Sequence, residues 1–326
     1  MNENKMGREV QKSFYRDWAD SREDLPLFYR PAWLDCVCGE ANWQVAVAQD
    51  EGGNVCGVLP FYESKTWFGR SVFNPPFSPF MGPLLFLPEE NQSNFSKYSF
   101  EKKILQELLR SLPEVAFVKL KWRPENQNWL PFYWAGYRQT TAYTFVIGGD
   151  TSIDGAFENL KNSVRADIEF AGRRGEVSES DELAAFYRLY SSVFEKQKKK
   201  PPFTFGRFSK TDDFLKSENR RLILLVNDRE TGEAEAGAYL IEDEKRIYLA
   251  ATGKSEAAGR GVVALAVWTA IQKSLEKKKS LDFEGSMLPG VEHFFRAFGG
   301  QMEPYFVVFK YARMLALLRI LSGKKN

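Results

Sequence analysis

Apolar residues occur in short runs along most of the chain, and two widely separated stretches share one arrangement of such runs. Trp43 to Tyr62 and Arg221 to Ile241 each contain an apolar run, a turn with glycine, and a second apolar run. Asp50 opens the first turn and Asp228 opens the second. Two apolar runs that flank a short turn are typical of an antiparallel hairpin. The sequence therefore predicts one β-hairpin in each half.

The segments that follow the two hairpins also correspond. Phe100 to Leu112 and Val262 to Lys278 have apolar residues at helical spacing, and each is followed by a short apolar run, Val115 to Lys121 and Ser280 to Glu284. The first pair predicts helices and the second pair predicts strands. Both halves thus continue from the hairpin into a helix and then a strand.

A direct internal match supports this duplication. Phe132 to Val146 aligns without a gap with Phe294 to Val308, and the two segments share Phe, Ala, Gln, Tyr and Val at corresponding positions. Self-similarity of this kind indicates a repeated architecture. Each half therefore reads as helix, antiparallel meander, helix, strand, short helix, strand. This order predicts a mixed α/β (α+β) fold with mostly antiparallel sheets flanked by helices, and not a doubly wound parallel sheet.

Turn-forming residues at 148–152 lie between the two periodic halves. We therefore expect an N-terminal arm over residues 1–24, a first domain over 25–150 and a second domain over 151–326. Ser152 or Asp154 is expected to cap the first helix of the second domain, which leads into Ala156.

Composition narrows the class of protein. The 326 residues are 44% hydrophobic and 15% aromatic, which is typical of globular domains, and 45 basic against 43 acidic residues leave a net charge of +2. No global field attracts DNA, so DNA is not an expected partner. Met1 to Asp20 has no apolar leader, which predicts a cytoplasmic protein. With His293 as the only histidine and three cysteines, no metal site is expected.

A set of short motifs resembles a known family. The C-terminal third contains D-F-E-G-S from Asp282 to Ser286 and P-G-V-E-H-F-F-R-A-F-G-G from Pro289 to Gly300, followed by Pro304-Tyr305. The N-terminal half contains Trp33-Leu34 and the proline-rich loop from Pro75 to Pro83. In these motifs and in its duplicated element order, the chain resembles the FemAB-like branch of the GNAT acyltransferase superfamily. The resemblance covers residues 25 to 312 and implies two tandem GNAT-like domains.

This resemblance implies transfer of an acyl or aminoacyl group to an amine. The donor expected first is acyl-CoA, such as acetyl-CoA, and the acceptor is the amine of a small molecule or a cell-envelope precursor. One alternative is an aminoacyl-tRNA donor used to build peptidoglycan bridges. Arg296 stands where that branch usually has lysine, and because arginine does not release its proton, this substitution weakens the tRNA alternative and leaves Arg296 a substrate-binding role. A further alternative is a non-catalytic binding module on a GNAT scaffold.

The expected donor site lies in the second domain. The resemblance matches Glu256 to Gly261 to the pyrophosphate-binding turn of the family, which implies that Gly259, Arg260 and Gly261 bind the donor at a helix start. Glu256 stands where the family usually has Gln or Arg. The alternative is a glycine loop that only caps the helix. Backbone N–H groups from Ala250 to Gly253 are expected to stabilise the oxyanion.

Two acids are candidates for the general base. Asp282 and Glu284 alternate along the strand predicted at 280–284, which would direct both carboxylates to one face of it. An amine nucleophile must lose a proton, and a partly buried carboxylate can accept it. Glu284 is the first choice, and the alternative is that both acids are solvated or cap a helix.

Two further segments are candidates for binding. Phe77 and Phe80, in the proline-rich loop, are expected either to line an apolar acceptor wall or to pack between domains. Ala312 to Leu321 has the pattern of an amphipathic helix flanked by basic residues. Such a helix docks on the protein body or lies on an anionic membrane surface, which makes peripheral membrane contact a second hypothesis.

Overall fold

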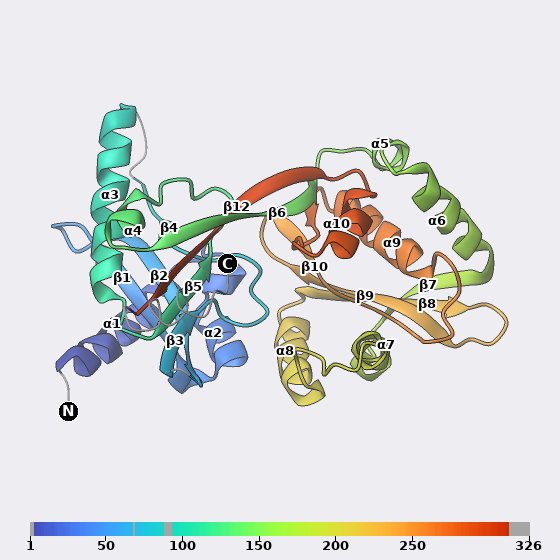
Figure 1. Cartoon of the computed structure of the whole chain (residues 1–326), viewed down its shortest axis with the longest axis horizontal. Helices are drawn as coiled ribbons and strands as arrows, with labels where there is room; N and C mark the ends of the chain where they lie inside the picture. The colour runs from blue at the N-terminus through green and yellow to red at the C-terminus, as the bar shows by residue number, and fades with distance from the viewer. Residues whose placement is uncertain (1–2, 68, 88–92, 313–326) are drawn as a thin grey trace, which may run out of the picture. The chain divides into compact units, whose positions relative to one another are not determined.

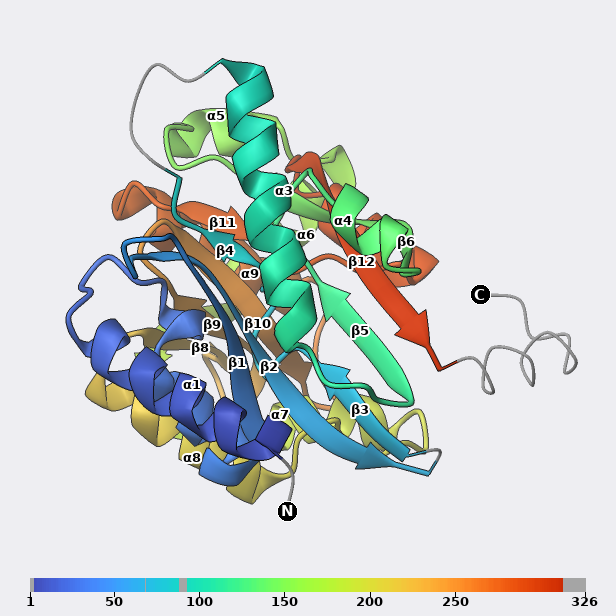
Figure 2. The same cartoon turned by 90° about the vertical axis from the view of Figure 1, so that its left-hand side faces the viewer.

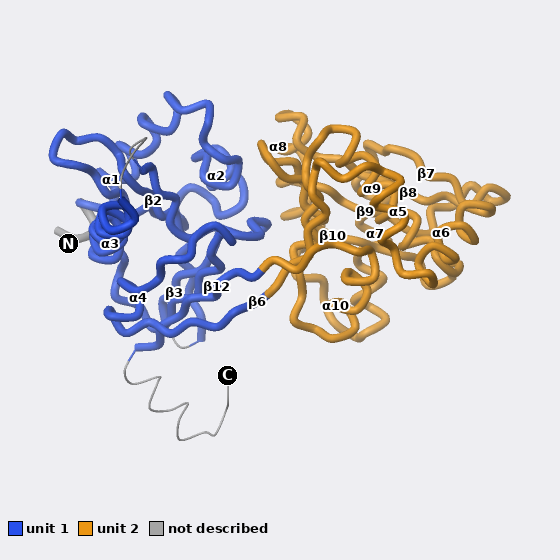
Figure 3. The backbone as a smooth tube through the Cα atoms, turned by 90° about the horizontal axis from the view of Figure 1, so that it is seen from above, with its two compact units in different colours: residues 1–142, 304–326 blue, residues 143–303 orange. Residues whose placement is uncertain are grey.

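The computed structural model describes residues 3–67, 69–87 and 93–312. Two compact units divide the chain, one made of residues 1–142 and 304–326 and the other of residues 143–303 (Figure 3). We call them unit 1 and unit 2. The chain enters unit 2 within strand β6 (Arg138–Ile147) and returns to unit 1 within strand β12 (Gln301–Tyr311).

The sheet of unit 1 is mixed and mostly antiparallel. Its strands follow the order β1-β2-β3-β5-β12, with β4 beside β2, and β3 and β5 are its parallel pair. The bounds of the strands not yet given are β1 Trp43–Gln49, β2 Val55–Thr66, β3 Gly69–Phe73, β4 Leu84–Leu85 and β5 Phe117–Lys121.

Helices cover this sheet, and α1 and α3 both pack against β1 (Figure 2). The core beneath α3 includes the fully buried side chains of Phe61, Leu108 and Trp122. The helices of unit 1 are α1 Glu3–Asp20, α2 Pro31–Cys38, α3 Asn94–Ser111 and α4 Leu130–Trp134, with short 3₁₀ turns η1 Leu27–Tyr29 and η2 Glu40–Asn42.

The sheet of unit 2 follows the order β6-β11-β10-β9-β8-β7. Its pairs are antiparallel except β10 with β11, which is parallel. The bounds are β7 Gly175–Ser180, β8 Arg221–Asp228, β9 Ala234–Glu242, β10 Arg246–Lys254 and β11 Ser280–Asp282.

Helices lie on both faces of this sheet (Figure 1). The apolar helix α9 packs against α6 and against β8 and β9, while α7 packs against β9 and β10 and contacts α8. The core between α9 and the sheet contains Leu240, Ala266 and Phe283, each at most 1% exposed. The helices are α5 Ile153–Glu158, α6 Asn162–Arg174, α7 Leu183–Glu195, α8 Phe205–Ser217, α9 Val262–Glu276 and α10 Pro289–Arg296.

The architecture confirms the mixed α/β fold class and the main elements expected from the sequence. The predicted hairpins are β1 with β2 and β8 with β9, and the predicted helices are α3 and α9. The side chain of Ser152 accepts a hydrogen bond from the backbone N–H of Gly155 (3.1 Å), so Ser152 is the residue that caps α5. The strand predicted at 280–284 is shorter, because β11 ends at Asp282.

The two units differ from the expected ranges 25–150 and 151–326, because the last strand of each half is exchanged. Ile147 of β6 pairs with Leu281 of β11 in unit 2, while Val308 of β12 pairs with Leu120 of β5 in unit 1. Residues 1–24 also differ from the expected arm, since α1 packs against β1 and the Tyr15 side chain is fully buried.

Of the amphipathic helix expected at 312–321, only Ala312 is described, and the rest lies outside the described residues. Among the helices that the structure describes, none combines the length and the apolar character needed to cross a membrane.

Candidate functional site

Strand β10 has an open edge in its second half. Its partner β9 follows it as far as Lys254, but β11 pairs only with Arg246, Ile247 and Tyr248. Within the described chain, β10 therefore has no strand beside it on the β11 side from residue 249 onward. The register with β9 also shifts between Leu249 and Ala251, which makes Ala250 a bulge. A bulge redirects backbone groups, so amides at this edge are suited to bind a ligand carbonyl.

Helix α7 packs closely against the same strand. A Cβ atom added at Gly253 would lie 2.4 Å from the backbone N of Tyr190 and 2.5 Å from the carbonyl carbon of Leu189. Glycine is thus required for the contact between α7 and β10. Of the residues expected to form an oxyanion site, Ala250 lies half-buried at the bulge, whereas Gly253 is buried beneath α7.

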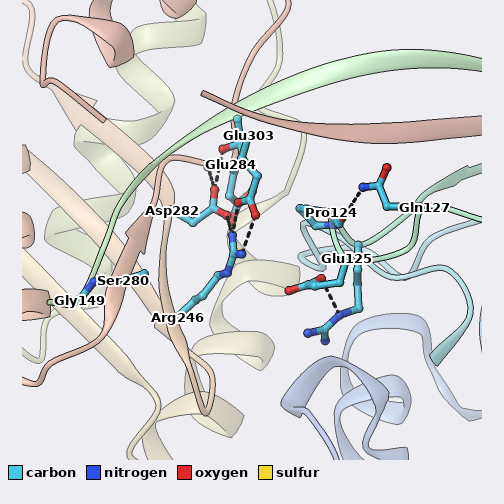
Figure 4. A network of polar contacts seen from close by, with 11 residues as sticks. Pro124, Glu125, Gln127, Gly149, Arg246, Ser280, Asp282, Glu284 and Glu303 are labelled. Atoms are coloured by element: carbon cyan, nitrogen blue, oxygen red, sulfur yellow. Dashed lines mark hydrogen bonds and ion pairs between the residues drawn. The ribbon is translucent and has the colours of Figure 1, made fainter. Parts of the chain in front are cut away.

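Asp282 lies at the end of β11 and its side chain is fully buried. Its Oδ1 accepts hydrogen bonds from Thr144 Oγ1 (2.6 Å) and from the backbone N–H of Glu284 (2.8 Å). Its Oδ2 accepts from Nη1 of Arg246 at 2.9 Å (Figure 4). Every oxygen of this carboxylate is engaged, so Asp282 holds the local structure together.

Arg246 joins this carboxylate to a second one. Its Nη1 and Nη2 donate to the two carboxylate oxygens of Glu303 at 2.6 and 3.0 Å, a bidentate arrangement. Burial raises the pKa of Asp282, and the hydrogen bonds from Thr144 and Arg246 oppose that rise. Burial alone would lower the pKa of Arg246, but Glu303 and Asp282 together raise it, so the guanidinium stays protonated.

The chain turns sharply after Asp282. Glu284 has φ 57° and Gly285 has φ 61°, both in the left-handed region. A Cβ at Gly285 would lie 2.1 Å from the carbonyl O of Tyr143, so glycine is required there. Glu284 has no such freedom, and a non-glycine residue in this conformation is strained. The expected strand alternation of Asp282 and Glu284 is therefore wrong, because Glu284 lies beyond the strand, half-buried.

The glycine turn at 259–261 precedes α9, as expected, but acidic groups contact it. The backbone N–H of Gly259 donates to Glu235 Oε1 at 3.3 Å, and Nε of Arg260 donates to Asp167 Oδ1 at 2.6 Å. Gly261 is the left-handed N-cap residue, and a Cβ there would lie 2.1 Å from the carbonyl O of Asp167. The approach of α6 therefore explains this glycine without a ligand.

The remaining candidates occupy two different units. In unit 2, Nε of Arg296 donates to Glu292 Oε1 at 2.6 Å across one turn of α10, with 58% of the Arg296 side chain exposed. In unit 1, Phe80 is 4% exposed and its ring lies 4.6 Å from that of Tyr305. Phe80 is thus a core residue, while Phe77 is half-buried with φ 56°.

The sequence matches no family model and no curated protein. Solved structures do match it over almost its whole length. FemX covers 96% of this chain and 98% of its own, with 14% identity and a TM-score of 0.68. The C-terminal domain of a putative lysylphosphatidylglycerol synthetase from Agrobacterium fabrum covers 96% of both chains at 11% identity and TM-score 0.57, and L-PGS from Bacillus licheniformis covers 95% of both at 13% and 0.56.

The chain therefore has the same fold as FemX. Within this fold, sequence reasoning missed Thr144, Arg246 and Glu303 as partners of Asp282. Arg246 is 36 residues from Asp282 in sequence and Thr144 is 138 residues away, so no local spacing reveals these pairs. The signal that was present is the charge of Arg246 at the start of an apolar strand. Among the described residues, no group of acids, cysteines or histidine could hold a metal ion.

Proposed function

We propose that this protein is an N-acyltransferase whose unit 2 moves an acyl group from an activated carboxyl donor to an amine. The observation that carries the proposal is the divergence of β10 and β11. Tyr248 pairs with Asp282 in parallel register, and beyond that pair β10 continues while β11 ends and its chain turns away. Two residues further along lie the Ala250 bulge and the strained Glu284. Backbone donors and a carboxylate thus follow the same branch point.

Each group has a role in the reaction. The amine nitrogen attacks the donor carbonyl carbon, and the C–N bond forms while the oxygen gains negative charge. A backbone N–H at the Ala250 bulge stabilises that oxyanion. Glu284 accepts the proton of the amine, directly or through a water, and the proton passes to the leaving thiolate or alkoxide as the tetrahedral intermediate collapses. Asp282 positions Glu284 through the backbone hydrogen bond and does not itself meet substrate.

With acyl-CoA as donor, the pyrophosphate binds at the turn from Gly259 to Gly261. The backbone N–H groups at the start of α9 and the helix dipole favour an anion there. Arg260 then exchanges its Asp167 partner for phosphate, which is feasible because 63% of its side chain is exposed. The acceptor is the amine of a small molecule or of a cell-envelope precursor.

An aminoacyl-tRNA donor is the second candidate, because the acids around the turn weigh against a pyrophosphate at that position. Glu235 accepts from the Gly259 N–H, Asp167 pairs with Arg260, and Glu256 is exposed nearby in sequence. A pyrophosphate placed among these carboxylates meets like-charge repulsion. A similar fold occurs in a protein named as a lysylphosphatidylglycerol synthetase, which supports aminoacyl transfer as a reaction for this scaffold.

Donor binding to the Arg260→Ala variant tests the proposal. If acyl-CoA binds at the turn, acetyl-CoA should bind the wild-type protein in calorimetry, and Arg260→Ala should weaken it about tenfold or more, since a hydrogen bond to a charged group is lost. Arg229→Ala removes another exposed arginine of unit 2 and should leave affinity within twofold.

Other outcomes discriminate between the alternatives. Binding of charged tRNA without any CoA binding would select the aminoacyl donor. The transferase proposal would be overturned if neither charged tRNA nor CoA binds and no amine is acylated in a panel of amino sugars, amino acids and peptide amines. The non-catalytic module would then be the remaining hypothesis.

A further inference from the structure

Unit 1 contains a pocket that none of the roles above uses. It has a volume of about 910 Å³ and lies where β3 and β5 begin and where α3 and β12 end. Its lining carries four cationic side chains and a single acid. The cations are Arg8 of α1, Arg70 of β3, Arg110 of α3 and Lys310 of β12, and the acid is Glu114.

Two of the cations share one carboxylate. Nη1 of Arg8 lies 2.9 Å from Glu63 Oε1, and Nη2 of Arg70 lies 2.7 Å from Glu63 Oε2. Half of the Arg70 side chain remains exposed. A guanidinium has five donors, so Arg70 keeps N–H groups that can bind a second anion.

The other two cations make no ion pair among the described residues. Arg110 lies in the last turn of α3, where the helix dipole favours a cation. That local effect does not explain Lys310, whose Nζ donates to the carbonyl O of Ala135 (2.8 Å) and lies 5.0 Å from the centre of the Tyr137 ring. Lysine binds a neutral carbonyl and an aromatic face here, so its charge is not neutralised.

We propose that this pocket binds an organic phosphate. The four cations with Glu63 and Glu114 leave a formal charge of +2, which matches a phosphate monoester of charge about −1.5 to −2. Arginine presents donors in a fork that fits phosphate oxygens.

The apolar part of the lining favours an organic ester over free phosphate. Val118 and Tyr137 are 4% and 7% exposed, and both contribute to the wall. Burial raises the pKa of Tyr137 to about 12, so the phenol is neutral at pH 7 and adds no repelling charge. Because all these residues belong to unit 1, binding here is independent of the acyl-transfer site.

The test uses the full chain with phenyl phosphate and inorganic phosphate as probes in calorimetry. Phenyl phosphate should bind more tightly than inorganic phosphate, and phenol should not bind. Arg110→Ala and Lys310→Gln should each weaken phenyl phosphate about tenfold. Lys103→Ala is the matched control, because Lys103 is an exposed cation of α3, like Arg110, but lies outside the pocket. The affinity of this variant for phenyl phosphate should stay within twofold of the wild-type value.

Vesicles distinguish a lipid headgroup from a soluble ester. Co-sedimentation with phosphatidic acid vesicles, and not with phosphatidylcholine vesicles, would identify a membrane source, whereas phenyl phosphate binding alone would identify a soluble one. The proposal is overturned if phosphate and phenyl phosphate both fail to bind at millimolar concentration. It is equally overturned if Lys103→Ala weakens binding as much as the pocket variants do. Two pocket variants are used, so misfolding of one, seen by circular dichroism, leaves the other as the test.

Discussion

Asp282 and Glu284 are two residues apart, yet their carboxyl groups have different surroundings. Asp282 is enclosed and accepts from a hydroxyl, a guanidinium and a backbone N–H. Glu284 is half-buried on a strained turn that Asp282 holds. Substitution of the two acids should therefore have different consequences, one for folding and one for chemistry.

If Glu284 takes the amine proton, Glu284→Gln keeps the shape of the side chain and removes its basicity. Turnover should fall about 10²- to 10⁴-fold with little change in donor affinity. Asp282→Asn, by contrast, removes the negative charge that faces Arg246 inside the protein and should lower the melting temperature together with activity. Steady-state kinetics and thermal melts of both variants, with Glu276→Gln as a surface control, give the answer. Unchanged turnover in Glu284→Gln would remove Glu284 from the mechanism.

At this scale the sequence predicted the types of residue near the site, but not their contacts. Two acids along a predicted strand are visible in the sequence. The burial of one of them is not, because it depends on Arg246 and Thr144, which other strands bring close. Similarly, the glycine at 261 is visible, but its cause is the backbone of Asp167 in α6.

The two hairpins show which elements local chemistry specifies. Asp50 accepts from the backbone N–H groups of Gly52 and Asn54, and Asp228 accepts from those of Glu230 and Thr231. Hydrogen bonds from Asn54 lower the pKa of Asp50, and backbone hydrogen bonds, first from Thr231, lower the pKa of Asp228. The turn residues themselves encode this geometry, so it was predictable from sequence.

The lowered pKa values of Asp50 and Asp228 predict that the stability of the fold depends on pH. A carboxyl whose pKa is lowered in the folded state stabilises the fold above the ordinary aspartate pKa of about 4, and this stabilisation is lost as pH falls through the lowered value. Asp228→Asn should therefore lower the melting temperature at pH 7, and the gap to wild type should close as pH falls below about 4. Melts followed by circular dichroism from pH 7 to pH 2 measure it, with Asp50→Asn expected to follow the same trend. A gap that stays constant over this range would contradict the prediction.

The position at which β11 ends was not predictable from local propensity. The pattern of apolar residues continues to Phe283, and glutamate rarely adopts a positive φ. The residue type at position 284 therefore does not indicate a turn. The turn forms because Asp282 binds the backbone N–H of Glu284 and Gly285 fits against Tyr143. Tertiary contacts therefore decide where this strand ends.

For the whole molecule, strand content was predictable and strand partnership was not. The repeat identifies β6 and β12 as the last strands of the two halves. Alternation of apolar residues predicts which face of a strand is buried, but not with which other strand it pairs. In the structure β6 pairs with β11 and β12 pairs with β5, so each unit is completed by the other half of the sequence.

A fragment cut at the sequence boundary should therefore fold poorly. Residues 151–326 lack the whole of β6 and leave the edge of β11 unpaired, and an unpaired edge favours association. Residues 138–303 retain all of β6 and include the whole of unit 2, which is residues 143–303. We expect 138–303 to be monomeric with a cooperative thermal transition, and 151–326 to aggregate or melt without cooperativity. Size-exclusion chromatography and thermal melts compare them, and a monomeric, cooperatively melting 151–326 would show that the exchanged strand is dispensable.

The return of the chain in β12 also sets an order of events during protein synthesis. Unit 2 is complete when residue 303 has been made, whereas unit 1 still needs residues 304–311 to cover β5. At typical elongation rates, β5 waits on the order of ten to thirty seconds for its partner strand. The usual order, in which the N-terminal domain folds first, is thus reversed. A nascent chain stalled near residue 300 would expose one edge of β5 to chaperones and to neighbouring chains on the same messenger RNA.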